Sequence, residues 1–313
     1  MDIRNRRGLK LEAKAALEAT SSSPKKLICI HTGASAALAL VLALLDYLLQ
    51  QQISNTGGLS GVGLRTILET AQAVLSYAEL AALLFWQIGY VYIALQIGRG
   101  QTVQINSLLE GFRQFGPVLR LRLLTMLLYS GVIFAGVYLG TTVFALTPWA
   151  EPLLVAYQTG TETAIMAAME SLMLPMMAVV IPVLLILLVP YYYRLRMADY
   201  LLMDHPEMGA MMAIRISRLM MRGNRLHLMK LDMSFWWFYV LELMTVLVGY
   251  GDLLLPMFGI RLPWSGTMSY FVFLALFYVS QLALYWWRGN EVRVTYALAY
   301  EALLPKETEK DCT

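Results

Sequence analysis

Several stretches of this chain are long enough and apolar enough to cross a lipid bilayer, and they constrain the fold more than any other feature. Residues 172–192, for example, contain no charged side chain. A helix rises about 1.5 Å per residue, so roughly 20 apolar residues cross a hydrocarbon core of roughly 30 Å. Six segments meet this requirement: residues 27–49, 74–97, 123–146, 172–192, 235–255 and 268–287. The sequence therefore predicts an all-α integral membrane protein of six transmembrane helices.

The composition and the charge distribution support this prediction and orient it. Of the residues, 58% are hydrophobic and 14% charged, whereas soluble domains carry about 25% charged residues. With six spans, both termini lie on one side of the membrane. All of the 24 Lys and Arg residues except Arg65 and Arg261 fall on that side. The positive-inside rule then predicts that both termini are cytoplasmic. The low charge also argues against a nucleic-acid partner.

Three parts follow from this topology. Residues 1–26 are predicted to form a cytoplasmic amphipathic segment, residues 27–287 the membrane domain, and residues 288–313 a polar cytoplasmic tail. A basic amphipathic segment precedes each outward span, so we interpret the membrane domain as three helical hairpins with cytoplasmic surface helices. The glycines Gly136 and Gly140 in the third span permit close packing of a second helix, or of a second copy of the chain.

The most distinctive of the cytoplasmic segments is residues 204–225, which we expect to form one amphipathic helix. Asp204 has the position of an N-cap, followed by Pro206 and Glu207 in the first turn. Further along, a basic stripe with helical spacing consists of Arg215, Arg218, Arg222 and Arg225. Such a helix can dock a partner protein or anionic lipid, or it can simply anchor the chain by the positive-inside rule.

Two sequence segments carry a resemblance to a known family. They are residues 9–14 (LKLEAK) and residues 217–225 (SRLMMRGNR), and the second match continues through Leu228, Leu231, Asp232, Ser234 and Phe235. The chain resembles the domain-of-unknown-function 975 family of bacterial membrane proteins, which is distantly similar to the membrane domain of some glycerophosphodiesterases. The resemblance implies a six-span protein of the bacterial plasma membrane. It implies no activity and assigns no functional residues.

Four carboxylates are candidate functional groups. Glu242 lies near the middle of the fifth predicted span, where a carboxylate is costly; it is either a proton or cation site or a hydrogen-bonded residue that holds helices together. Asp46, Glu79 and Asp252 lie near the outer ends of their spans. They can form an acidic vestibule for cations or a basic peptide, or they are ordinary carboxylates that reach the interface.

Catalytic and metal motifs are weak in this sequence. Gly249-Tyr250-Gly251-Asp252 matches the Gly-x-Gly-Asp pattern of intramembrane aspartyl proteases, with Asp46 as the second carboxyl that such an enzyme needs. However, Asp46 precedes Tyr47, which is the reverse of the order in that family. The three histidines lack metal-ligand spacing, and the two cysteines, Cys29 and Cys312, are both predicted to be cytoplasmic. We therefore predict no metal, no cofactor and no structural disulfide.

Three classes of function remain open. The first is a non-enzymatic factor that supports transport, export or envelope maintenance, and that contacts anionic lipids, another membrane complex or a second copy of itself. The second is a small transporter or channel that uses the intramembrane carboxylates. The third is an intramembrane aspartyl protease.

Overall fold

The computed structural model describes residues 3–20, 23–55, 62–159, 161–257, 259–260, 263 and 266–304. Within these residues the regular structure is entirely helical. Among the described residues, five helices are long and apolar enough to cross a membrane, and one bent pair of helices could form a sixth span. The predicted class, an all-α integral membrane protein, is therefore confirmed. Arg261 and residues 305–313 lie outside the described residues.

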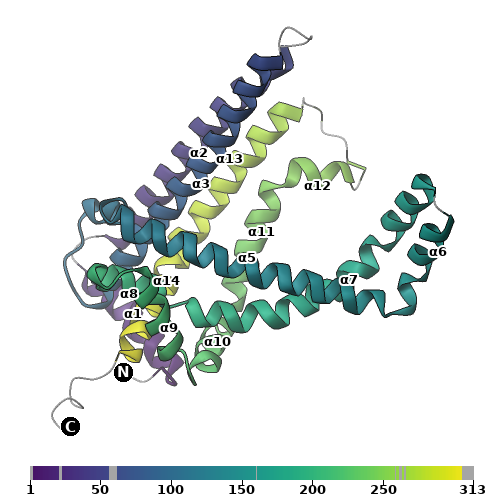
Figure 1. The fold of residues 1–313 in the computed structure, drawn as a ribbon. Helices are drawn as coiled ribbons and strands as arrows, with labels where there is room; N and C mark the ends of the chain where they lie inside the picture. The colour runs from purple at the N-terminus through teal and green to yellow at the C-terminus, as the bar shows by residue number, and fades with distance from the viewer. Residues whose placement is uncertain are drawn as a thin grey trace. The chain divides into compact units, whose positions relative to one another are not determined.

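The chain forms two compact units, and unit 1 comprises Met1–Val118, Asp199–Pro206 and Leu226–Thr313. In unit 1, α2 (Pro24–Asn55) packs along both α3 (Val62–Gly98) and α13 (Gly266–Leu284), as Figure 1 shows. The helix α11 (Trp236–Gly249) packs against α13. These elements coincide with predicted spans, because their long apolar runs contain few groups that would need water.

One end of unit 1 is covered by the first and last helices of the described chain. The helices α1 (Arg6–Ala19) and α14 (Asn290–Leu303) pack on each other and on α3. Leu9 and Ala13 of α1 are buried there, as are Ala297 and Tyr300 of α14. The short elements η2 (Ile105–Leu109) and α4 (Glu110–Arg113) also pack on α3. This end holds most of the densely packed core of the unit.

The helix α14 corrects the sequence-based prediction of a polar tail. Residues 290–303 were expected to be tail, but they form a helix whose residues are largely buried. The helix continues from α13 through a π-helical turn, Tyr285–Gly289. Its polar groups are satisfied inside the fold, since the Asn290 side chain donates to the Pro24 carbonyl and contacts the Tyr90 hydroxyl. Hydropathy alone did not reveal this helix, because polar and charged residues interrupt its apolar positions.

The fifth predicted span, residues 235–255, is broken in the structure. The helix α10 (Arg225–Met233) meets α11 at an angle of 68°, and α12 (Gly251–Met257) begins after Tyr250. In this part of the chain no single described helix is long and apolar enough to be a span, but α10 and α11 taken together are. The structure thus has five long candidate spans, with this bent pair as the candidate for the sixth.

Unit 2 comprises Leu119–Ala198 and Glu207–Arg225. It contains most of α5 (Phe115–Ala145), together with η3 (Pro148–Ala150), α6 (Glu151–Thr159), α7 (Glu162–Leu195) and α9 (Ala210–Met220). The helices α5 and α7 touch where a Cβ added at Gly140 would lie 2.8 Å from the Val180 Cα. Apolar side chains elsewhere on this pair are exposed, for example Leu174 at 80% and Phe134 at 75%. Exposed apolar surface of this kind is typical of helices that face lipid or a protein partner.

The expected single helix over residues 204–225 is wrong. Asp204 ends α8 (Ala198–Asp204), a short 3₁₀ turn (Pro206–Met208) follows, and α9 begins only after Gly209. Gly209 has φ 75°, a conformation that glycine adopts readily and that interrupts a right-handed helix. Asp204 does not act as an N-cap because its carboxylate accepts hydrogen bonds from Arg99 and Tyr300 instead.

Candidate functional site

The arginine stripe predicted from the sequence opens onto a groove in unit 2. The groove has a volume of about 1120 Å³ and lies between α5 and α9. Four arginines line it: Arg120, Arg215, Arg218 and Arg222. Its apolar wall includes Leu123, Leu124, Leu127 and Leu128 of α5 and Met211, Met212 and Leu219 of α9. The described residues that line this groove include no Asp or Glu.

The packing of α9 explains why its arginines face outward. Ala213, Ile214 and Ser217 are buried, and the Ser217 hydroxyl donates to the Arg194 carbonyl at 2.9 Å on α7. With that face fixed, Arg215 and Arg218 are left on the exposed side of the same helix. Met211, Met212 and Leu219, which also line the groove, are exposed as well, so cationic and apolar side chains border one cavity.

The stripe does not run along one helix as the sequence suggested. Arg215 and Arg218 belong to α9, Arg222 lies in the turn after it, and Arg225 begins α10. Arg225 is not among the residues that line the groove. Arg218 is positioned by Tyr191, whose hydroxyl accepts a 3.2 Å hydrogen bond from its Nη2. The groove gains one cation that the sequence analysis did not select, Arg120 at the start of α5.

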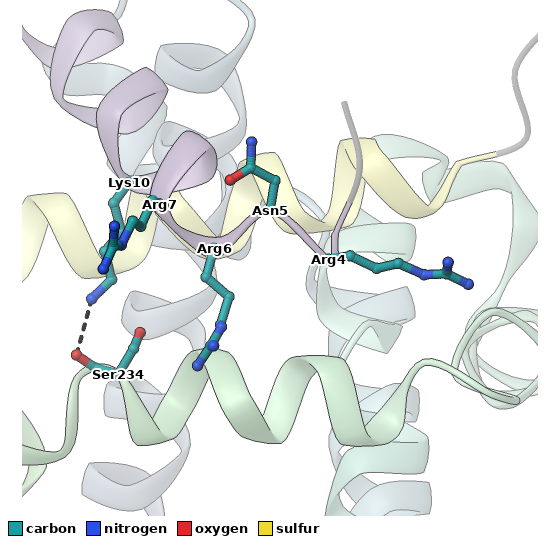
Figure 2. Close-up of a pocket in the computed structure, with 6 residues that line it drawn as sticks. All are labelled: Arg4, Asn5, Arg6, Arg7, Lys10 and Ser234. Carbon is teal, nitrogen blue, oxygen red and sulfur yellow. Dashed lines mark hydrogen bonds between the residues drawn. The ribbon is translucent and has the colours of Figure 1, made fainter.

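A second basic cavity lies in unit 1, where the N-terminus of α1 meets the end of α10. Its volume is about 530 Å³, and it is lined by Arg4, Asn5, Arg6, Arg7, Lys10 and Ser234. Figure 2 shows Lys10 and Arg6 directed toward α10 and Arg4 directed away from it. The Lys10 Nζ donates to the Ser234 carbonyl at 2.9 Å and lies 3.7 Å from the Phe235 ring centroid. Partial burial lowers the pKa of Lys10.

Of the candidate carboxylates, Glu242 has the best-defined surroundings. The Tyr285 hydroxyl donates to Glu242 Oε1 at 2.5 Å. Nearby, the Gln281 amide of α13 donates to the Thr245 hydroxyl of α11 at 2.6 Å. Polar contacts therefore link α11 both to α13 and to the π-helical turn that follows α13. Glu242 therefore has a hydrogen-bond donor outside its own helix, and a proton or cation site at this residue stays a prediction.

The other carboxylates are not brought into contact with one another. Asp46 lies on α2 and Asp252 in the first turn of α12, both partly exposed. No hydrogen bond or ion pair joins these two carboxylates within the described part of the chain. Glu79 lies on α3, but its side chain is outside the described residues. Among the described residues no cluster of His, Cys, Asp or Glu could hold a metal ion. Cys29 is a free thiol, and Cys312 is outside the described residues.

Comparison with known proteins gives one match. The family described as "Protein of unknown function (DUF975)" matches residues 5–287. The chain belongs to the DUF975 family. No curated protein and no solved structure matches this DUF975 protein. The matched range contains the arginine groove, the four carboxylates and the broken fifth span. It ends inside the π-helical turn, so α14 lies beyond it.

Among the described residues of this DUF975 protein, an ion-pair cluster that has no signal in the sequence lies at the end of α3. The Arg99 guanidinium forms a bidentate pair with Asp204, with distances of 2.6 and 2.8 Å, and its Nε donates to Glu301 at 2.7 Å. Tyr300 donates to the same Asp204 carboxylate at 2.9 Å. Hydrogen bonds to Asp204 raise the pKa of Arg99. These residues are 105 and 202 positions from Arg99 in sequence, so no local pattern could have revealed the cluster.

Proposed function

We propose that this DUF975 protein is a non-enzymatic factor of the bacterial plasma membrane that holds anionic phospholipid in the arginine groove. In this way it supports transport, export or envelope maintenance. The observation that carries the proposal is the composition of the groove: its described lining residues include four arginines and no carboxylate, beside a wall of leucines and methionines. A phospholipid has both parts that such a groove recognises, an anionic headgroup and an apolar chain.

The chemistry of arginine fits a phosphate headgroup. Its planar guanidinium presents a fork of N–H donors that matches two phosphate oxygens. Arg215, Arg218 and Arg222 are exposed and follow one another at intervals of three and four residues, so several can reach one headgroup. Each cation near an anionic membrane surface contributes about 1 kcal/mol of attraction. The positive-inside pattern supports a position of these residues at the cytoplasmic leaflet.

The apolar wall favours lipid over a soluble anion. Leu127 is 69% exposed and Met211 71% exposed, and both line the groove. A free phosphate ion would leave these side chains uncovered, whereas an acyl chain covers them. Burial of apolar surface contributes roughly 25 cal/mol per Å², so a chain lying along the leucines adds substantially to the binding of the headgroup.

The test compares lipid retention by two variants that remove the same charge. In the groove variant, Arg215, Arg218 and Arg222 are each replaced by Gln. In the control variant, Lys14, Arg65 and Arg113 are each replaced by Gln; all three are more than half exposed and pair with a carboxylate on their own helix. The full chain is purified in detergent, mixed with phosphatidylglycerol or phosphatidylcholine, and the bound lipid is measured by native mass spectrometry.

We expect wild type and the control variant to retain phosphatidylglycerol in preference to phosphatidylcholine. The groove variant should lose this preference, because three cations at about 1 kcal/mol each correspond to a factor on the order of 100 in affinity. Equal retention by the two variants would contradict the proposal. Glycerol phosphate carries the headgroup without acyl chains and therefore tests the contribution of the leucine wall. If it displaces the lipid at equal concentration, the groove binds only the headgroup. Circular dichroism and thermal unfolding confirm that both variants are folded.

A further inference from the structure

A separate cavity of about 240 Å³ lies inside unit 1, and no part of the proposed lipid site lines it. It is formed by four helices: α2, α3, α13 together with its π-helical turn, and α14. The polar residues that line it include His31, Gln87, Gln281, Tyr285 and Arg293. Among the described residues that line it, Arg293 is the one charged side chain, and none is Asp or Glu. A cavity with one cation and several polar groups is suited to a small anion.

Arg293 hydrogen-bonds the Tyr285 hydroxyl and packs over two aromatic rings, an arrangement that uses only part of the donor set of its guanidinium. Its guanidinium carbon lies 4.3 Å from the Tyr90 ring centroid and 4.9 Å from the Tyr285 ring centroid, positioned over both rings. Cation–π contacts engage the faces of a guanidinium, while its N–H groups lie in the plane. Within the described residues no Asp or Glu forms a salt bridge with Arg293; the nearby Glu242 carboxylate accepts from the Tyr285 hydroxyl, which lies between the two charged groups.

His31 provides independent evidence that the cavity receives a ligand. The residue is only 6% exposed, and its Nε2 atom is buried with no hydrogen-bond partner among the described residues. Its ring is fixed by a stacked contact with Trp86 and an edge contact with Tyr90. A buried polar atom without a partner costs about 1–3 kcal/mol, and native proteins contain few of them. A ligand with an oxygen atom in this cavity would satisfy it.

The backbone beside the cavity is irregular in a way that is common at binding sites. Tyr285 begins the π-helical turn that ends at Gly289. Single π-helical turns within α-helices are rare and occur often at functional sites. Here the turn joins α13 to α14, and so it sets the relative positions of Tyr285 and Arg293.

We propose that this cavity binds a small organic monocarboxylate. The in-plane donors of Arg293 pair with the two carboxylate oxygens, and the planar fork of the guanidinium matches that group better than it matches a spherical halide. The remainder of the ligand contacts the aromatic side of the cavity, Phe277 and Tyr278. The volume limits the ligand to a few non-hydrogen atoms, because sites for drug-sized molecules are about 300–1,000 Å³.

The experiment uses the full chain in detergent and sodium butyrate as the probe. Butyramide, which has the same shape without the charge, is the matched control, and inorganic phosphate and chloride test other anions. Binding is measured as a concentration-dependent rise in Tm. We expect butyrate to raise Tm and butyramide to have at least a tenfold weaker effect at equal concentration. If phosphate or chloride stabilises the protein more than butyrate does, the assignment to carboxylates is overturned.

Variants locate the site. Arg293→Gln should weaken butyrate binding at least tenfold, and Arg288→Gln, which removes a nearby arginine that pairs with Glu291, should leave it unchanged. Leu83→Trp fills the cavity without altering Arg293, so it should abolish butyrate binding. This second variant keeps the test decisive even if the Arg293→Gln protein does not fold. Binding to the Leu83→Trp protein with wild-type affinity would overturn the proposal. The groove variant of unit 2 should bind butyrate as wild type does, which separates this result from that of the lipid experiment.

Discussion

The contact between α5 and α7 makes a quantitative prediction about three glycines of α5. An alanine Cβ at Gly140 would lie 2.8 Å from the Val180 Cα, and one at Gly136 would lie 2.7 Å from the Leu184 Cδ1. Carbon atoms pack at about 3.5–4.0 Å, so α7 would have to withdraw by about 1 Å at Gly140. At Gly136 the nearest atom is the end of a side chain, which can rotate away. Gly131 on the same helix has nothing within 4 Å of the added atom.

Overpacking of this kind costs about 1–3 kcal/mol. We therefore expect Gly140→Ala to lower the Tm of the purified protein by several degrees and Gly136→Ala to lower it less. Gly131→Ala should leave it unchanged or raise it slightly, because alanine favours helix over glycine by roughly 1 kcal/mol. Thermal unfolding in one detergent, followed by circular dichroism, ranks the three variants. Equal stability of Gly140→Ala and Gly131→Ala would refute the intramolecular contact. A change in oligomeric mass without a change in monomer stability would instead assign these glycines to a seam between two copies.

Three further predictions concern unit 1 and the topology. Arg99→Gln should cost about 2–3 kcal/mol, because it removes both hydrogen bonds to the largely buried Asp204 carboxylate and the one to Glu301, whereas the exposed Arg113→Gln should cost at most about 0.5 kcal/mol in the same unfolding assay. Tyr285→Phe should lower stability by roughly 1–2 kcal/mol, since Glu242 loses its donor; an unchanged Tm would count against that hydrogen bond. In a cysteine-free background, Trp149→Cys should react with an impermeant thiol reagent on intact cells and Arg113→Cys should not. The opposite pattern would reverse the predicted orientation.

The sequence predicts the helical membrane class well because hydropathy accumulates over a whole span. Each apolar residue in residues 172–192 contributes independently, so the prediction survives three internal prolines, Pro175, Pro182 and Pro190. The same independence explains the failure at residues 290–303. There, burial depends on partners such as Pro24 and Arg99, which are more than 200 positions away. A local window sees polar side chains and cannot see the groups that satisfy them.

In the candidate sites, too, local features are predictable from the sequence and long-range contacts are not. Helical spacing correctly marks Arg215 and Arg218 as neighbours on one exposed face, because that relation depends only on local geometry. It does not predict that Arg120 joins them across the groove, nor that Gly209 interrupts the helix before them. Arg293 was not selected at all, since its two aromatic neighbours come from different helices.

The arginines of the two proposed sites differ in solvent exposure, and this difference predicts a different dependence of anion binding on salt. The groove arginines are exposed, so their attraction for an anion is screened over about 8–10 Å at physiological salt and several of them are needed for a useful affinity. Arg293 lies over two aromatic rings beside a small cavity, where the effective dielectric constant is lower, so the proposed binding needs only one cation. Lipid selection in the groove should consequently fall steeply with ionic strength, and carboxylate binding in the cavity should fall much less. If both proposals hold, salt dependence alone should distinguish lipid binding in the groove from carboxylate binding in the cavity.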